Sequence, residues 1–174
     1  MNSQGRNSSN TRRTLREYIK AIIILGRIKV FWIFPLFFFL TIYFFNIRGT
    51  MLVIIQGLSL SFLMFIGSTV NDLYDFDYDK KNPRKANFVR SINLIGRKNL
   101  IFFIIFFSLV LIVASFISFN YQNVLLILLL LLLPIIYSKP QIRFKNFPIL
   151  NLVIMPLVFL LVIMSAFTQG FSIK

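Results

Sequence analysis

The chain has 174 residues, 57% of them hydrophobic, with 22 Phe and a formal net charge of +14. Together with a mean hydropathy of +0.80, this apolar content excludes an ordinary soluble domain and indicates an integral membrane protein. The sequence contains no Cys and no His, which excludes disulfides, thiol or imidazole metal ligands and His-based acid–base catalysis. Any bound metal must therefore have oxygen ligands.

The first 17 residues are mainly Ser, Asn, Thr and Arg, and their composition predicts a disordered basic arm. Residues 18–174 are predicted to form a transmembrane domain. The arm is interpreted as a topogenic tail that touches lipid, in preference to an arm that binds nucleic acid.

Five apolar runs in the rest of the chain predict an all-α fold with about five transmembrane helices, because a span requires about 20 apolar residues. They cover Val30–Phe45, Met51–Val70, Leu100–Phe119, Val124–Tyr137 and Phe147–Phe167. The first and fourth runs are short, so their helices are expected to extend through Ala21–Leu25 and over Asn123–Ser138, respectively.

The basic residues predict the orientation of these spans. Seven Lys and Arg precede the first span, seven follow the second and three follow the fourth, whereas Arg48 and Lys174 alone fall on the other side. The positive-inside rule then places the N-terminus and the loop after the second span in the cytoplasm. Topology and attraction to anionic lipid account for the net charge without a nucleic-acid partner.

Four of the five acidic residues lie within eight positions at the end of the second span: Asp72, Asp75, Asp77 and Asp79. If the helix continues through Asp79, then Asn71, Asp75 and Asp79 fall within about 80° of arc, with Asp72 beside them and Asp77 on the opposite side. Two carboxylates about 6 Å apart repel by about 3 kcal/mol at an effective dielectric constant near 20, so they require a counter-charge or a proton. Mg²⁺, with one or two carboxylates and further oxygens from water and phosphate, is the predicted partner.

Two interpretations of this acidic cluster remain open at this point. Four basic residues follow it directly, Lys80, Lys81, Arg84 and Lys85, and they could simply neutralise it in a solvated loop. The same cations could instead bind the oxygens of a diphosphate whose charge a metal shares.

The motif NDLYDFDYD, Asn71 to Asp79, resembles the first Asp-rich motif, NDxxDxxxD, of the UbiA-type intramembrane prenyltransferases. Three further segments resemble this family in the same order along the chain. They are Leu25-Gly26-Arg27, Asn82-Pro83-Arg84-Lys85, and Tyr137-Ser138-Lys139-Pro140 with Arg143-Phe144-Lys145.

The resemblance implies Mg²⁺-dependent transfer of an isoprenyl group from an isoprenyl diphosphate to a lipophilic acceptor in the membrane. It assigns Asn71, Asp72, Asp75 and Asp79 to the metal, and Asp75, Asp79 and Tyr137 to catalysis. It assigns Asn71, Arg27, Arg84, Lys85 and Ser138 to the diphosphate. The implied acceptor is a carotenoid, another isoprenoid or an aromatic compound, and the Asn82–Lys85 sequence is similar to that of members that prenylate carotenoids.

The family fold is a nine-helix bundle with a second Asp-rich motif, whereas this sequence has about five predicted spans and no Asp or Glu after Asp79. One expectation is therefore the N-terminal half of a prenyltransferase that works with a separate C-terminal-half chain. The alternatives are an inactive truncated relic or scaffold subunit and, least favoured, a divalent-cation transporter component.

Overall fold

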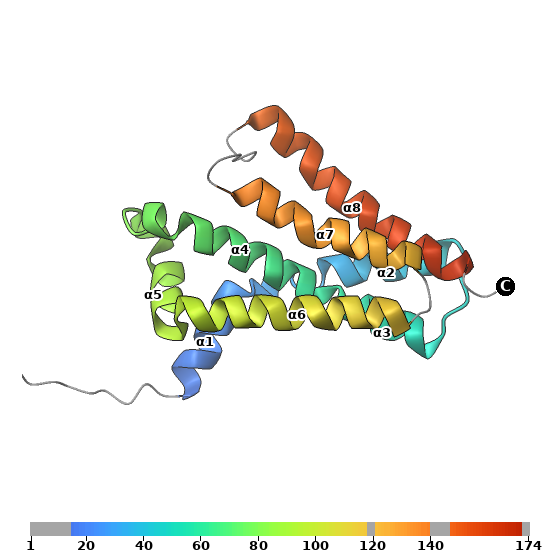
Figure 1. The fold of residues 1–174 in the computed structure, drawn as a ribbon, viewed down its shortest axis with the longest axis horizontal. Helices are drawn as coiled ribbons and strands as arrows, with labels where there is room; N and C mark the ends of the chain where they lie inside the picture. The colour runs from blue at the N-terminus through green and yellow to red at the C-terminus, as the bar shows by residue number, and fades with distance from the viewer. Residues whose placement is uncertain (1–14, 118–120, 140–146, 172–174) are drawn as a thin grey trace, which may run out of the picture.

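The computed structural model describes residues 15–117, 121–139 and 147–171, and these residues form a helical bundle without β-strands (Figure 1). Four helices are long and apolar enough to cross a membrane, and a bent helix pair at the N-terminus makes up to five. The predicted fold class, an all-α membrane protein with about five spans, is confirmed.

The first predicted span is a bent pair of helices and not one continuous helix. Helix α1 (Leu15–Leu25) and the segment from the 3₁₀ turn η1 (Ile28–Val30) through α2 (Ile33–Phe44) meet at 50°. Because α1 begins at Leu15, the last three residues of the predicted disordered arm are helical. The expected extension of the first span through Leu25 exists, but a break separates it from α2.

The second span ends in the acidic motif. Helices α3 (Met51–Ser59) and α4 (Ser61–Asp79) form one membrane-crossing unit over Met51–Asp79. The Thr50 side chain caps the start of α3 by accepting a hydrogen bond from the backbone N–H of Val53 at 3.3 Å. Helix α4 continues through Asp79, so the predicted helical geometry of the motif is confirmed.

A short turn and an amphipathic helix connect the second and third spans. Asn82 caps the 3₁₀ turn η2 (Pro83–Lys85), and helix α5 (Ala86–Ile95) follows and packs against α1. Helix α5 is followed by Gly96, whose φ of 90° favours glycine. The third span, α6 (Arg97–Ile117), begins directly afterwards.

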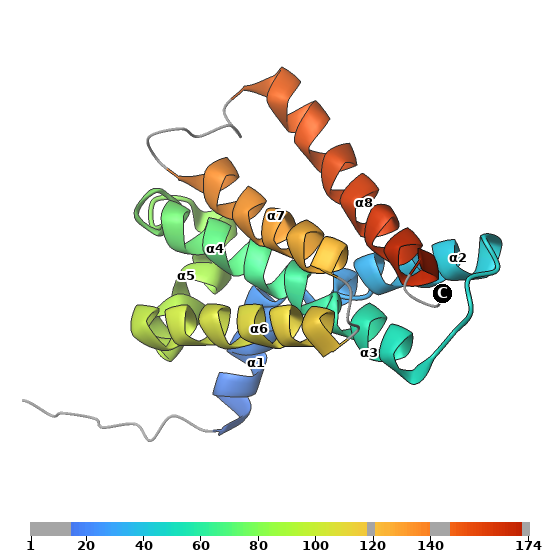
Figure 2. The same cartoon turned by 45° about the vertical axis from the view of Figure 1, so that its right-hand side comes forward.

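The last two described helices are α7 (Tyr121–Ser138) and α8 (Pro148–Phe171), which diverge toward the end of the bundle that carries the acidic motif (Figures 1 and 2). The predicted extension of the fourth span over Asn123–Ser138 is confirmed. Helices α4 and α7 approach closely at Gly67, where an added Cβ would lie 3.6 Å from Pro134 Cγ.

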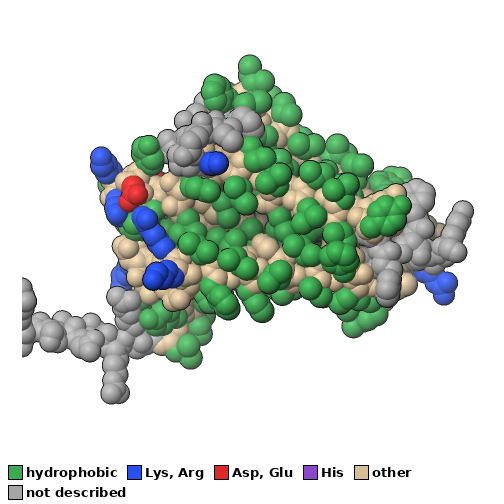
Figure 3. All heavy atoms as spheres, viewed as in Figure 1, with side chains coloured by type: hydrophobic (Ala, Val, Ile, Leu, Met, Phe, Trp, Pro, Cys, Tyr) green, Lys and Arg blue, Asp and Glu red, His purple; other side chains and the backbone are tan. Residues whose placement is uncertain are grey.

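The surface separates apolar and charged regions as a membrane protein requires. Hydrophobic side chains cover the flanks of the helices, and most of the visible charged side chains gather at the end near the α4–α5 connection (Figure 3). Inside, Phe38, Leu60, Leu111, Ile127 and Val162 belong to one buried cluster that joins α2, α3, α4, α6, α7 and α8. This core fixes the helices around the cavity described next.

Candidate functional site

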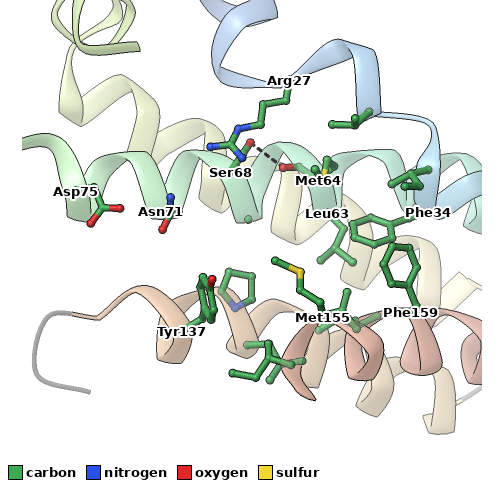
Figure 4. A pocket seen from close by; sticks show the side chains of 18 residues that line it. Arg27, Phe34, Leu63, Met64, Ser68, Asn71, Asp75, Tyr137, Met155 and Phe159 are labelled. Atoms are coloured by element: carbon green, nitrogen blue, oxygen red, sulfur yellow. Dashed lines mark hydrogen bonds between the residues drawn. The ribbon is translucent and has the colours of Figure 1, made fainter. Parts of the chain in front are cut away.

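A cavity of about 400 Å³ lies between α2, α4, α7 and α8 and has a polar and an apolar end (Figure 4). Arg27, Asn71, Asp75 and Tyr137 are at the polar end. Aliphatic, aromatic and Met side chains line the rest, including Phe34, Leu63, Met64, Met155 and Phe159. The cavity thus joins charged and hydrogen-bonding groups to a hydrocarbon-lined space.

One face of α4 supplies the oxygen ligands of the polar end. Asn71 and Asp75 lie one turn apart and point toward α7, from which Tyr137 faces them (Figure 4). The neighbouring Ser138 donates a hydrogen bond from its hydroxyl to Asn71 Oδ1 at 3.3 Å. The structure therefore brings together Asn71, Asp75, Tyr137 and Ser138, four of the residues assigned to the site from sequence.

Arg27 reaches the same cavity from the break between α1 and η1. It has the left-handed backbone conformation, φ 47° and ψ 51°, which costs a non-glycine residue about 1–2 kcal/mol. Its guanidinium donates a hydrogen bond from Nη2 to Asp72 Oδ1 at 3.1 Å and lies 5.7 Å from the Phe88 ring centroid. The Ser68 hydroxyl lies 2.8 Å from the Leu25 carbonyl oxygen, just before the break, and also 2.8 Å from the Met64 carbonyl oxygen in its own helix, so these two acceptors share its single proton (Figure 4).

The other acidic and basic residues of the motif lie away from the cavity wall. Asp79 pairs with Lys85 at 3.7 Å between Oδ2 and Nζ, and Arg84 is exposed. The cavity lining, as far as the structure describes it, does not include Asp79, Arg84 or Lys85. Asp77 faces solvent and pairs with Lys80 and Arg97, as expected for the opposite side of α4.

The residues predicted to hold Mg²⁺ do not converge on one point. Within residues 15–117, 121–139 and 147–171, no group of three or more acidic side chains is arranged to hold a metal ion. Asn71 and Asp75 nevertheless present two oxygen-bearing side chains to one cavity. This pair fits Mg²⁺, which accepts few protein ligands and takes its remaining oxygens from water and substrate phosphates.

The sequence did not identify which apolar residues line the cavity. Among 22 Phe, the cavity contains Phe34 and Phe159, whose ring centroids are 5.6 Å apart. They come from α2 and α8, and no local pattern distinguishes them from Phe residues that face lipid. Of the predicted loop similar to the family pattern, Pro140, Arg143, Phe144 and Lys145 lie outside the described residues.

Comparison with known families identifies the chain. A model of the UbiA prenyltransferase family matches residues 30–171. The chain belongs to the UbiA prenyltransferase family. Membership supports a prenyltransferase-type function in the membrane, and UbiA enzymes generally use Mg²⁺, isoprenyl diphosphates and lipophilic acceptors. No curated protein and no solved structure matched the chain.

Proposed function

We propose that this UbiA-family protein transfers an isoprenyl group from an isoprenyl diphosphate to a lipophilic acceptor in a Mg²⁺-dependent reaction. One observation carries the proposal: the cavity has Arg27, Asn71 and Asp75 at one end and an apolar lining at the other. A donor with an anionic head and a hydrocarbon tail matches this polarity. The diphosphate would lie at the polar end and the isoprenyl chain along the apolar lining, which includes Phe34 and Phe159.

In the proposed reaction, the bond between the donor's C1 and the diphosphate oxygen breaks, and the diphosphate leaves with the electron pair. The acceptor's electrons then form the new bond to C1, and a proton leaves the acceptor. Arg27 stabilises the charge of the departing diphosphate through N–H donors. Tyr137, opposite Asp75, places a ring face where it can stabilise the positive charge that develops on the isoprenyl group.

Asn71 and Asp75 are the residues that we propose to hold Mg²⁺ together with diphosphate oxygens and water. When bound there, the ion would offset the negative charge of the leaving diphosphate. Ser138 orients the Asn71 amide, because its hydroxyl donates to the amide oxygen. Asp79 remains a predicted participant that pairs with Lys85 in the structure.

We also propose that this polar end faces the cytoplasm, with the N-terminus on the same side. The support is the concentration of Lys and Arg before the first span and after the second and fourth. We favour an isoprenoid or carotenoid acceptor over an aromatic one, by resemblance of the Asn82–Lys85 sequence. A separate chain that supplies the second half of the site remains part of the proposal.

The test measures conversion of a radiolabelled isoprenyl diphosphate to lipid-soluble product by membranes that contain the full chain. Isoprenoid, carotenoid and aromatic acceptors are compared, with the chain alone and with any neighbouring reading frame that encodes further spans. We expect product that EDTA abolishes and Mg²⁺ restores. Asp75→Asn should abolish it, whereas Asp77→Asn, the same change on the solvent-facing side of α4, should leave it intact.

Three outcomes distinguish the alternatives. Product from the chain alone would mean that one chain type builds the site. Product only with the second chain would establish a split enzyme. Folded protein without turnover in either preparation would refute the proposal and favour a relic or scaffold.

A further inference from the structure

The contact between Arg27 and Asp72 joins the break after α1 to the acidic motif across 45 residues of sequence. We infer that Asp72 is a positioning residue that holds the Arg27 guanidinium against the donor diphosphate, and that it is not a ligand of Mg²⁺. This inference rests on the proposed function and assigns a separate role to one of the four acids in the motif. Three observations support it: the direction of the Asp72 side chain, its burial, and the backbone conformation of Arg27.

The direction of Asp72 separates it from the predicted metal ligands. Neighbouring residues of a helix point about 100° apart, so Asp72 points away from the line formed by Asn71 and Asp75. Those two residues line the cavity, and Asp72 is absent from its described lining. Its Oδ1 atom instead accepts the hydrogen bond from Arg27, which does line the cavity.

Because Asp72 is buried, its contact with Arg27 can hold the Arg27 side chain in place. The side chain of Asp72 is 1% exposed and that of Arg27 is 35% exposed, so the carboxylate lies inside while the guanidinium reaches the cavity. A buried carboxylate requires a charged partner, and the Arg27 guanidinium is in ion-pair contact with Asp72. The contact uses one N–H of Nη2, and Arg27 Nε is buried without a hydrogen-bond partner in the described part of the chain.

The backbone around Arg27 is fixed as well. Its left-handed conformation is sparsely populated for a residue with a side chain, and such conformations persist only where the surroundings hold them. Ser68 and Asp72, one turn apart on α4, both contact this segment: the Ser68 hydroxyl lies 2.8 Å from the Leu25 carbonyl oxygen, which shares its proton with the Met64 carbonyl, and Asp72 accepts a hydrogen bond from the guanidinium. Helix α4 therefore holds the backbone and side chain of this segment at neighbouring points.

An arginine fixed in this way binds an anion with little further ordering. Arg has a long side chain whose rotamer entropy opposes binding, and an anchor that holds it in place reduces this cost. The negative charge of Asp72 also offsets part of the positive charge of Arg27, and this effect by itself would weaken the attraction of Arg27 for a diphosphate. We expect the positioning effect to be the larger of the two, so that replacement of Asp72 weakens diphosphate binding.

The experiment uses the full chain in detergent and inorganic diphosphate as the probe. Thermal unfolding is recorded over a range of diphosphate concentrations with Mg²⁺, and over a range of Mg²⁺ concentrations with diphosphate. The first series gives an apparent diphosphate affinity, and the second gives the Mg²⁺ concentration for half-maximal protection. The variants are Asp72→Asn, Arg27→Lys and their combination, with Asp75→Asn for comparison and the exposed Asp77→Asn as the matched control.

We expect Asp72→Asn to weaken diphosphate binding roughly tenfold, about the contribution of one charge-assisted hydrogen bond, with no change in the Mg²⁺ midpoint. The double variant should bind no more weakly than the weaker single variant, because both changes remove the same contact. Asp75→Asn should raise the Mg²⁺ midpoint, and Asp77→Asn should match the wild type. If Asp72→Asn loses its cooperative unfolding transition, Asp72→Glu replaces it, because it keeps the charge but displaces the guanidinium, and the same result is expected.

A raised Mg²⁺ midpoint in the Asp72 variant would overturn the inference in favour of a metal ligand. Unchanged or tighter diphosphate binding would overturn it in favour of charge compensation alone. In both cases the wild type still binds diphosphate, so the proposed function stands. If the wild type shows no diphosphate protection at any Mg²⁺ concentration, the proposed function and the inference both fail.

Discussion

Gly57 provides a direct test of the packing between α2 and α3. A Cβ added at this position would collide with Phe39 Cζ and lie 2.8 Å from Phe38 Cδ1, which is closer than real Cβ contacts. Phe38 is fully buried and packs edge-on against Phe39, with ring centroids 5.5 Å apart. Little space is therefore available for Phe38 to move away, and Gly57→Ala should force the two helices apart.

Gly67 offers a matched comparison in the same span, because an added Cβ there meets Pro134 at an ordinary 3.6 Å. In both helices, Ala is favoured over Gly by about 1 kcal/mol in intrinsic propensity. Gly57→Ala adds an overpacking cost of about 1–3 kcal/mol. We therefore expect Gly67→Ala to stabilise the protein and Gly57→Ala to be less stable than Gly67→Ala by about 1–3 kcal/mol, since the propensity gain is common to both.

The assay is unfolding in mixed micelles as the fraction of sodium dodecyl sulfate increases, followed by circular dichroism and by gel filtration. Both variants and the wild type are measured in the same detergent and at the same protein concentration. A Gly57→Ala protein as stable as Gly67→Ala would refute the reasoning. It would mean that α3 does not approach the two aromatic rings as closely as the structure shows.

Three further predictions concern the cavity and its support. Tyr137→Phe removes one hydroxyl at the polar end of the cavity and should lower kcat about fivefold, the contribution of one hydrogen bond. The unfolding midpoint should not fall. Unchanged turnover would limit the role of Tyr137 to its ring. Phe159→Trp adds bulk at the apolar end of the cavity and should shift the preference of the protein toward shorter isoprenyl diphosphates, measured as relative kcat/KM. An unchanged preference would mean that the hydrocarbon chain of the donor lies elsewhere. Ser68→Ala removes the hydroxyl that contacts both the Leu25 and the Met64 carbonyls, and it should lower the free energy of unfolding by about 1 kcal/mol, measured in the same micelle titration. No loss would mean that the hydroxyl donates to Met64 within α4 and does not support the break after α1.

Features that depend on local periodicity and composition could be predicted from the sequence. Long apolar runs predicted the spans, because a helix in the membrane satisfies its own backbone hydrogen bonds and needs a fixed apolar length. The four-residue spacing predicted that Asn71 and Asp75 share a face, and both line the cavity. The absence of Cys and His restricted any metal to oxygen ligands.

The rotation of the helices against one another could not be predicted from the sequence. Helical spacing placed Asp72 beside the other motif residues, but packing against the end of α1 directs it to Arg27, 45 residues away. The Ser138 contact with Asn71 spans 67 residues, and Phe34 and Phe159 meet across two helices. A sequence period specifies which side chains share a face, but the neighbour of that face depends on interhelical packing, which no single helix encodes.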